Sequence, residues 1–380
     1  MEKAAILQYL ESLAALQNSS EPGNATQGFE QEDYLRHVLL LVIYTLTFIM
    51  VMIGNGIVLL VAARTNVLSA DLKPYLCSLA LADICIAIFC VPFISAETIL
   101  QEWRFGNAMC PIVKYVQQVS VMVSIFTLTA VSIDRFRAVV HPLQIRTSIS
   151  RKKVVVTAIW FIAMSLGITQ LVAYRVEVHF LNFRPRPVCK NILTDSAQLI
   201  QRFCVFLGLF VIPFTVLVIT YSLTACKLWR HSLPGERDRQ QFRRNQRGKK
   251  KVVTMLFVTV LAFFMCWLPS QIFSILVMTY RPIHNYGNEV LVSYIHIFVV
   301  WLSMAHGFFN PFIYTFMNMN FREEVKKIFI CLCRQKCYSD VVANGITGRI
   351  RMRRYETTVI NTTMQSLSSF RSSVMSNSKK

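Results

Sequence analysis

Seven long apolar stretches alternate with shorter polar segments along the chain. Each stretch reaches about 20 residues, the length that a helix needs to cross the hydrocarbon core of a membrane. The pattern therefore predicts an all-α membrane protein whose core is a bundle of seven transmembrane helices. The predicted spans are residues 38–63, 74–98, 108–140, 154–173, 199–228, 252–280 and 290–317.

Prolines lie inside these stretches at Pro92, Pro213, Pro269 and Pro311. A proline lacks the backbone N–H and clashes with the preceding turn, so it breaks a helix in water. In a membrane bundle, neighbouring helices and buried waters satisfy the freed carbonyl groups. We therefore expect kinks at these positions.

The composition agrees with a membrane protein, because 54% of the residues are hydrophobic and 16% are charged, against about 25% charged in soluble domains. The 40 Lys and Arg outnumber the 20 Asp and Glu. These basic residues lie between the apolar stretches, so nucleic acid is not an expected partner. A transporter and an enzyme are disfavoured, because the chain shows no repeated hydropathy pattern and its spans contain no catalytic motif.

The polar segments differ in charge. Residues 1–37 hold two basic and six acidic residues, residues 227–251 hold ten basic and two acidic, and the tail after Phe321 holds twelve and four. Because basic segments stay in the cytoplasm, we expect a multi-pass protein of the cell membrane with an extracellular N-terminus and a cytoplasmic C-terminus. The predicted organisation is an extracellular segment (1–37), the bundle (38–318) and, at the end, a disordered cytoplasmic tail (334–380).

Two glycosylation sequons begin at Asn18 and Asn24, in the segment expected outside the cell. We predict glycosylation at both. The first 37 residues contain no apolar core of a cleavable signal peptide, so the first span is expected to act as the insertion signal.

Asp83 lies deep in the second predicted span, where an ionisable group needs a partner or a function. Asn55, Ser124 and Asn310 lie at comparable depth in other spans. Their oxygens could coordinate a sodium ion together with Asp83, because small hard cations prefer oxygen ligands. A hydrogen-bonded network without an ion, or a protonated aspartate, is the alternative. No other cofactor is expected.

Other polar residues allow two interpretations. Asp134 and Arg135, at the end of the third span, can form a local pair that leaves the arginine free to swing, or can be a solvated helix end. Gln117, Gln118, Gln271 and His306 can be functional, or can simply hold the helices together by hydrogen bonds.

Short motifs in register on all seven spans resemble the rhodopsin-like class of G-protein-coupled receptors, over about residues 39–333. They are Gly54-Asn55, Leu79 to Asp83, Asp134-Arg135-Phe136, Trp160, Pro213 with Tyr221, Phe263 with Cys266 to Pro269, and Asn310-Pro311-Phe312-Ile313-Tyr314.

The resemblance implies an activation mechanism and its partners. An agonist would act through Ile125, Pro213, Phe263 and Trp267 to favour outward movement of the sixth helix. A heterotrimeric G protein would then bind, with arrestin and receptor kinases acting at the tail. The further activation-switch residues that the resemblance implies are Asp134, Arg135, Tyr221, Asn310, Pro311 and Tyr314.

Four cysteines have implied roles. Cys110 and Cys189 resemble the disulfide pair that joins the third helix to the second extracellular loop. Cys331 and Cys333 resemble palmitoylation sites that anchor a short amphipathic eighth helix, residues 319–333, to membrane lipid. Residues 176–180 alternate in polarity and are expected to form a hairpin with the strand near Cys189.

The ligand class follows from Gln117, which stands where amine receptors carry an aspartate. An amide side chain both donates and accepts, so it suits an amide-bearing ligand. The chain is most similar to receptors for the pyroglutamylated RFamide peptide (QRFP) and neuropeptide FF, which implies a C-terminally amidated peptide. Neuropeptide Y, orexin and tachykinin receptors are alternatives, and a lipid or other small-molecule receptor is a further one.

In this interpretation Gln117 binds the peptide amide, and Trp267 and Trp301 contact its phenylalanine ring. Glu97 and Glu177 are alternative partners for its arginine. The full set of predicted ligand residues is Glu97, Gln117, Gln118, Glu177, Trp267, Gln271, His296 and Trp301.

Overall fold

A computed structural model provides the structure of the protein and describes residues 25–64, 72–140, 148–181, 184–230, 239–279, 289–317 and 319–333. The chain forms two compact units, one ending at Asn318 and one beginning at Met319. The predicted sequons at Asn18 and Asn24 and the predicted tail, residues 334–380, lie outside the described residues.

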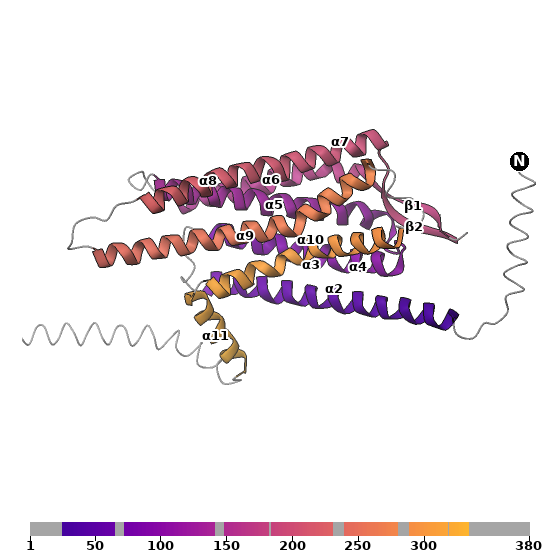
Figure 1. Ribbon diagram of the computed structural model, residues 1–380, viewed down its shortest axis with the longest axis horizontal. Helices are drawn as coiled ribbons and strands as arrows, with labels where there is room; N and C mark the ends of the chain where they lie inside the picture. Colours follow the sequence, from indigo (N-terminus) through magenta and orange to yellow (C-terminus); the bar gives the residue numbers. More distant parts are fainter. Residues whose placement is uncertain are drawn as a thin grey trace, which may run out of the picture. The chain divides into compact units, whose positions relative to one another are not determined.

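The first unit is a bundle of long helices with a two-stranded hairpin at one end (Figure 1). Within the described residues, seven helical segments are long and apolar enough to cross a membrane, which confirms the predicted seven-helix fold. The helices are α2 (Ala25–Arg64), α3 (Lys73–Phe89), α4 (Val91–Leu100), α5 (Gly106–Val140), α6 (Ile149–Ala173), α7 (Asp195–Phe206), the π-helical turn η1 (Leu207–Val211), α8 (Ile212–Arg230), α9 (Arg239–Thr279) and α10 (Glu289–Met317).

The second and fifth spans are interrupted beside their prolines. Pro92 lies in the first turn of α4, where a helix has no backbone bond to lose by the missing N–H. Pro213 follows the π-helical turn η1, whose wider backbone replaces regular α-helical bonding just before the proline ring. Pro269 and Pro311 lie inside the continuous helices α9 and α10.

Helix α5 contacts α3, α6, α8 and α9 and supplies much of the buried core, including Val123, Ile125 and Leu128. Large apolar side chains also cover the outside of the bundle: Phe161 on α6 is 63% exposed and Met265 on α9 is 65% exposed. Such a surface is unfavourable in water but is solvated by lipid tails. The protein is therefore a multi-pass membrane protein.

The hairpin consists of β1 (Tyr174–Leu181) and β2 (Arg184–Asn191), which pair antiparallel with Val176 opposite Cys189. This confirms the hairpin predicted from the alternating polarity of residues 176–180. We call the end of the bundle that carries it the hairpin end.

The second unit contains α11 (Met319–Cys333), which covers the residues predicted for the eighth helix. On α11 the Nζ of Lys327 donates to Glu324 Oε1 at 2.7 Å, and this bond raises the pKa of the exposed lysine. Attachment of α11 to lipid through Cys331 and Cys333 stays a prediction.

Candidate functional site

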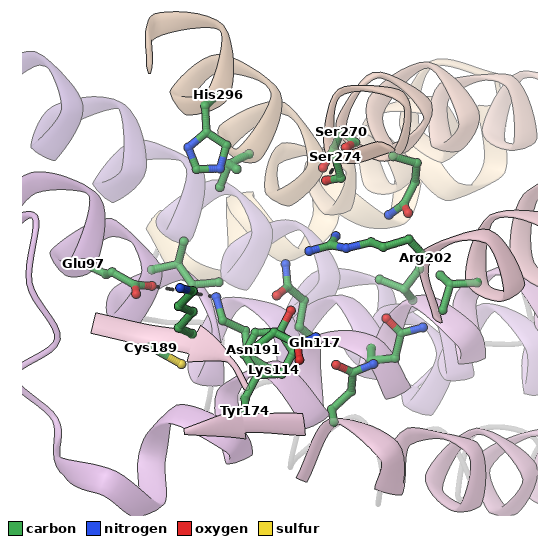
Figure 2. Close-up of a pocket in the computed structure, with 18 of the residues that line it drawn as sticks. Glu97, Lys114, Gln117, Tyr174, Cys189, Asn191, Arg202, Ser270, Ser274 and His296 are labelled. Atoms are coloured by element: carbon green, nitrogen blue, oxygen red, sulfur yellow. Dashed lines mark hydrogen bonds and ion pairs between the residues drawn. The ribbon is translucent and has the colours of Figure 1, made fainter. Parts of the chain in front are cut away.

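A cavity of about 550 Å³ opens among the helices at the hairpin end (Figure 2). Its volume lies in the range of pockets that enclose small ligands or part of a peptide. Residues of α4, α5, α7, η1, α9, α10 and both strands line it. The structure brings six of the predicted ligand residues into this lining: Glu97, Gln117, Gln118, Trp267, Gln271 and His296.

Two predicted ligand residues do not line the cavity. The Nε1 of Trp301 donates to Thr47 Oγ1 on α2 at 3.1 Å, so this indole packs between α10 and α2. Glu177 lies on the exposed surface of β1, with Oε2 3.9 Å from His179 Nε2. Neither side chain therefore lines the cavity in which the sequence places a ligand ring beside Trp301 and a ligand arginine beside Glu177.

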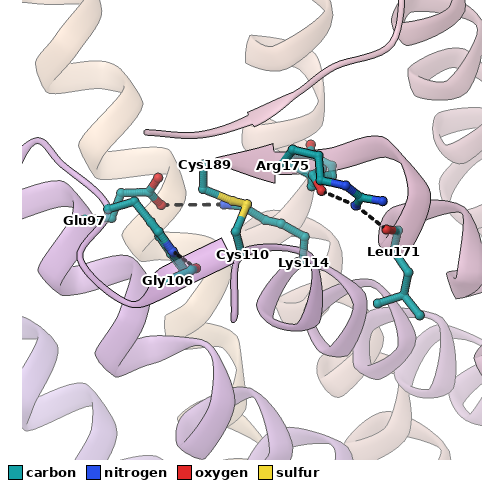
Figure 3. Close-up of a disulfide and its surroundings, with 9 residues drawn as sticks. Glu97, Gly106, Cys110, Lys114, Leu171, Arg175 and Cys189 are labelled. Atoms are coloured by element: carbon teal, nitrogen blue, oxygen red, sulfur yellow. Dashed lines mark hydrogen bonds and ion pairs between the residues drawn. A yellow bond between two sulfur atoms is a disulfide. The ribbon is translucent and has the colours of Figure 1, made fainter. Parts of the chain in front are cut away.

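Glu97, the other candidate partner of a ligand arginine, already has a cationic neighbour. The Nζ of Lys114 on α5 lies 3.8 Å from Glu97 Oε2 on α4 (Figure 3), and 5.9 Å from the ring centroid of Tyr174. The sequence interpretation did not single out Lys114. A lysine inside an apolar span was the signal that could have identified it.

Trp267 lines the cavity and is in contact with two further aromatic side chains. Its ring stacks on Phe263 of the same helix at a centroid distance of 6.3 Å and meets the His306 ring of α10 at 5.4 Å. Ile125 and Pro213, the other members of the predicted coupling group, are both buried. The Trp267 side chain thus joins the cavity to the centre of the bundle.

The His306 ring that meets Trp267 also lies beside the buried carboxylate of Asp83. Its Oδ2 accepts a hydrogen bond from Asn310 Nδ2 at 2.8 Å, and its Oδ1 lies 3.2 Å from His306 Nε2. Three of the oxygens predicted for the sodium site are buried and have no hydrogen-bond partner among the described residues: Asp83 Oδ1, Asn55 Oδ1 and Ser124 Oγ. This donor set fits a small hard cation such as sodium.

His306, which the sequence leaves open as functional or structural, is part of this cluster. Its Nδ1 lies 2.7 Å from the Ser303 carbonyl oxygen, which can only accept a hydrogen bond. In a neutral ring the single proton therefore resides on Nδ1, and the lone pair of Nε2 faces the Asp83 carboxylate. A positive charge between these two atoms would relieve their repulsion.

At the opposite end of α5, the predicted local pair is present. Arg135 Nη2 donates to Asp134 Oδ2 at 2.8 Å, and the buried Lys152 of α6 donates to the same oxygen at 3.2 Å. Tyr221 on α8 and Tyr314 on α10 are buried, and the ring of Tyr221 packs against Phe257 at 5.6 Å. Lys152 lies in the first turn of α6, before the predicted apolar span, and was not among the predicted switch residues.

Comparison with known proteins identifies the family of this chain. The sequence profile described as "7 transmembrane receptor (rhodopsin family)" matches residues 54–314. The chain belongs to this family. It is a family of receptors and not of enzymes.

Three relatives illustrate the similarity of this rhodopsin-family receptor to known members. The RYamide receptor of Drosophila melanogaster is 32% identical over 291 residues, which are 75% of this chain and 62% of that receptor, less than two thirds of its length. The RYamide receptor of Tribolium castaneum is 28% identical, over 82% of this chain and 86% of the relative. The QRFP-like peptide receptor of Branchiostoma floridae is 26% identical, over 80% and 81%.

The rhodopsin-family receptor also contains the disulfide that the resemblance implied. Cys110 at the start of α5 is bonded to Cys189 of β2 (Figure 3). Trp103 supports the same junction, because its backbone N–H donates to the Pro187 carbonyl and its Nε1 donates to the Gly106 carbonyl at 2.8 Å. These bonds fix the hairpin beside the cavity.

Proposed function

We propose that this receptor binds a C-terminally amidated neuropeptide that ends in Arg-Phe-amide or Arg-Tyr-amide and activates heterotrimeric G proteins. The observation that carries the proposal is the row of amide side chains in the cavity, combined with the RYamide and QRFP-like peptide receptors among its relatives. Charged groups in the lining, such as Glu97 and Arg202, argue against a lipid ligand.

The amide groups suit the end of such a peptide. Gln117 and Gln118 are adjacent on α5, and Gln271 faces the same cavity from α9. The Nε2 of Gln118 is buried and has no hydrogen-bond partner among the described residues. A ligand carbonyl would satisfy this donor, while a terminal carboxamide could also donate to a glutamine oxygen.

Activation would follow from a difference in agonist affinity between two arrangements of the bundle. An agonist that contacts Trp267 and prefers an outward position of α9 shifts the population toward that state by this difference alone. Arg135 would then leave Asp134 and, with Tyr221 and Tyr314, line the opening that receives the G protein. Arrestin and receptor kinases would act at the tail.

The proposal also covers the orientation of the chain in the membrane and the binding of a sodium ion. The N-terminus, glycosylated at Asn18 and Asn24, would be extracellular, and the cavity would open on that side. Asp83, Asn55 and Ser124 would hold a sodium ion, with Asn310 keeping the Asp83 carboxylate in place. The ion would supply a positive charge that stabilises the buried carboxylate.

Amidated peptides compared with their free acids test the ligand class. In cells that express the receptor, calcium and cyclic AMP are measured after addition of Arg-Phe-amide and Arg-Tyr-amide peptides and the matching acids. We expect responses to the amides only, and a loss of potency of about tenfold in Gln117→Ala, because a buried amide partner is removed.

Glu177→Gln serves as the control, since Glu177 lies outside the cavity, and its potency should match that of the wild type. The proposal would be overturned if a well-expressed receptor gave no calcium or cyclic AMP response to any amidated peptide, or responded equally to amides and acids.

A further inference from the structure

The cations of the cavity differ in whether they have a carboxylate partner. Lys114 lies beside Glu97, and these two charges offset each other. Arg202 on α7 lines the same cavity, yet no carboxylate of the described residues lies within salt-bridge distance of its guanidinium. A guanidinium without a carboxylate partner can form charge-assisted hydrogen bonds with a bound anion.

The helix geometry explains why Arg202 faces the cavity. Gln198, Arg202, Val205 and Leu209 all line it, and their spacing of three to four residues places them on one face along α7 and η1. Figure 2 shows the Arg202 side chain extending from α7 into the space between the helices. Its position therefore follows from the register of the helix and not from a loop.

The neighbours of Arg202 leave its charge unneutralised. Glu97 is the acidic side chain of the cavity lining, and Lys114 is 3.8 Å from it on the side of α4 and α5. The glutamines of the lining are neutral and cannot neutralise a guanidinium. The cavity thus has a compensated pair on one side and an uncompensated guanidinium on α7.

We propose that Arg202 is the anchor for a carboxylate of the ligand. A guanidinium presents a planar fork of donors that matches a carboxylate with two parallel hydrogen bonds. The carboxylate can belong to an acidic side chain near the end of the peptide, or to a free C-terminus. This inference rests on the proposed function, in that a peptide occupies the cavity, and it adds an acidic group to the ligand.

A matched set of peptides and variants tests the anchor. The peptides end in Arg-Phe-amide, with Asp, Asn or Lys at each of the preceding positions in turn, and one set ends in the free acid. They are applied to wild type, Arg202→Gln and Arg202→Glu receptors of equal surface expression. Arg186→Gln is the control, because Arg186 is an arginine of the hairpin that does not line the cavity.

We expect one Asp position to give the most potent peptide on the wild type. Its potency should fall by about 30-fold when Asp becomes Asn, and by a similar factor in Arg202→Gln, where Asp and Asn peptides become equal. Arg202→Glu should respond best to the Lys peptide, and Arg186→Gln should behave as the wild type. If the free acids are instead the peptides that depend on Arg202, the anchor holds and the amide in the proposed function is wrong.

Equal potency of Asp and Asn peptides at every position, together with free acids that do not depend on Arg202, would overturn the anchor and leave the proposed function intact. The absence of a response to every peptide would instead refute the proposed function. The anchor is then decided on purified receptor, from melting temperatures with an excess of acetyl-Asp-Phe-amide or acetyl-Asn-Phe-amide. The anchor is supported if acetyl-Asp-Phe-amide raises the melting temperature more than acetyl-Asn-Phe-amide does and this difference is absent in Arg202→Gln. Equal increases in melting temperature with the two compounds refute it.

Discussion

Lys152 shares one oxygen of Asp134 with Arg135, although it comes from another helix. Its side chain is 3% exposed, and its Nζ lies 3.2 Å from Asp134 Oδ2, against 2.8 Å for Arg135 Nη2. Two cations compete for this one carboxylate oxygen, so Lys152 weakens the hydrogen bond between Arg135 and Asp134. Removing this lysine should stabilise the arrangement in which Arg135 is bound to Asp134.

We therefore expect Lys152→Met to lower agonist-independent G-protein activation, by about threefold, since the charge-assisted hydrogen bond from Arg135 to Asp134 is then no longer shared with a second cation. The measurement is nucleotide exchange on a G protein in membranes with equal receptor content. Lys153→Met, an exposed neighbour, is the control and should leave the basal rate unchanged. A raised basal rate in Lys152→Met would show that the lysine stabilises the inactive arrangement instead.

The individual site residues were predictable only where a motif or a helical register determined them. Gln117 and His296 line the cavity because each occupies an inward position of a long helix. Trp301 is also on such a helix, but its direction depends on how α10 packs against Thr47 of α2, which no local pattern encodes. The pairing of Lys114 with Glu97 likewise joins two helices whose relative rotation the sequence does not specify.

At the scale of elements, the close approach of α2 and α10 depends on Gly54. A Cβ atom at Gly54 would lie 2.8 Å from Pro311 Cγ, and a proline ring cannot move aside as a flexible side chain would. Gly54→Ala is expected to destabilise the receptor by about 1 to 3 kcal/mol, the usual cost of overpacking. The readout is the melting temperature of the purified protein.

Gly56 provides the matched control for Gly54. It lies on the same helix, and a Cβ there meets no atom within 4 Å, so Gly56→Ala should preserve the melting temperature or raise it slightly. Equal melting temperatures for the two variants would mean that α2 and α10 are not in close contact at Pro311.

The elements themselves follow from hydropathy, whereas their ends and irregularities do not. α2 begins at Ala25 and α9 at Arg239, well before the predicted spans at residues 38 and 252, because a helix can continue into polar residues that hydropathy excludes. The π-helical turn before Pro213 was likewise invisible, because the proline predicts a kink but not the backbone form it takes.

At the scale of the whole molecule, seven crossings are an odd number, so the start and the end of the chain lie on opposite faces of the membrane. The hairpin and its disulfide mark one face, and a disulfide is stable in an oxidising compartment. The charge distribution of the polar segments predicts the same orientation independently, since basic segments are expected on the cytoplasmic side. Two unrelated features therefore predict the same face as extracellular.

We expect an epitope tag before Met1 to bind antibody on intact cells, and a tag after Lys380 to bind only after the cells are permeabilised. The reason is that a chain with an odd number of crossings must expose its two ends on opposite sides, and the basic segments hold the second end in the cytoplasm. Labelling in the reverse sense would contradict the orientation and place the cavity on the cytoplasmic face. Labelling of both tags on intact cells would contradict the number of crossings itself.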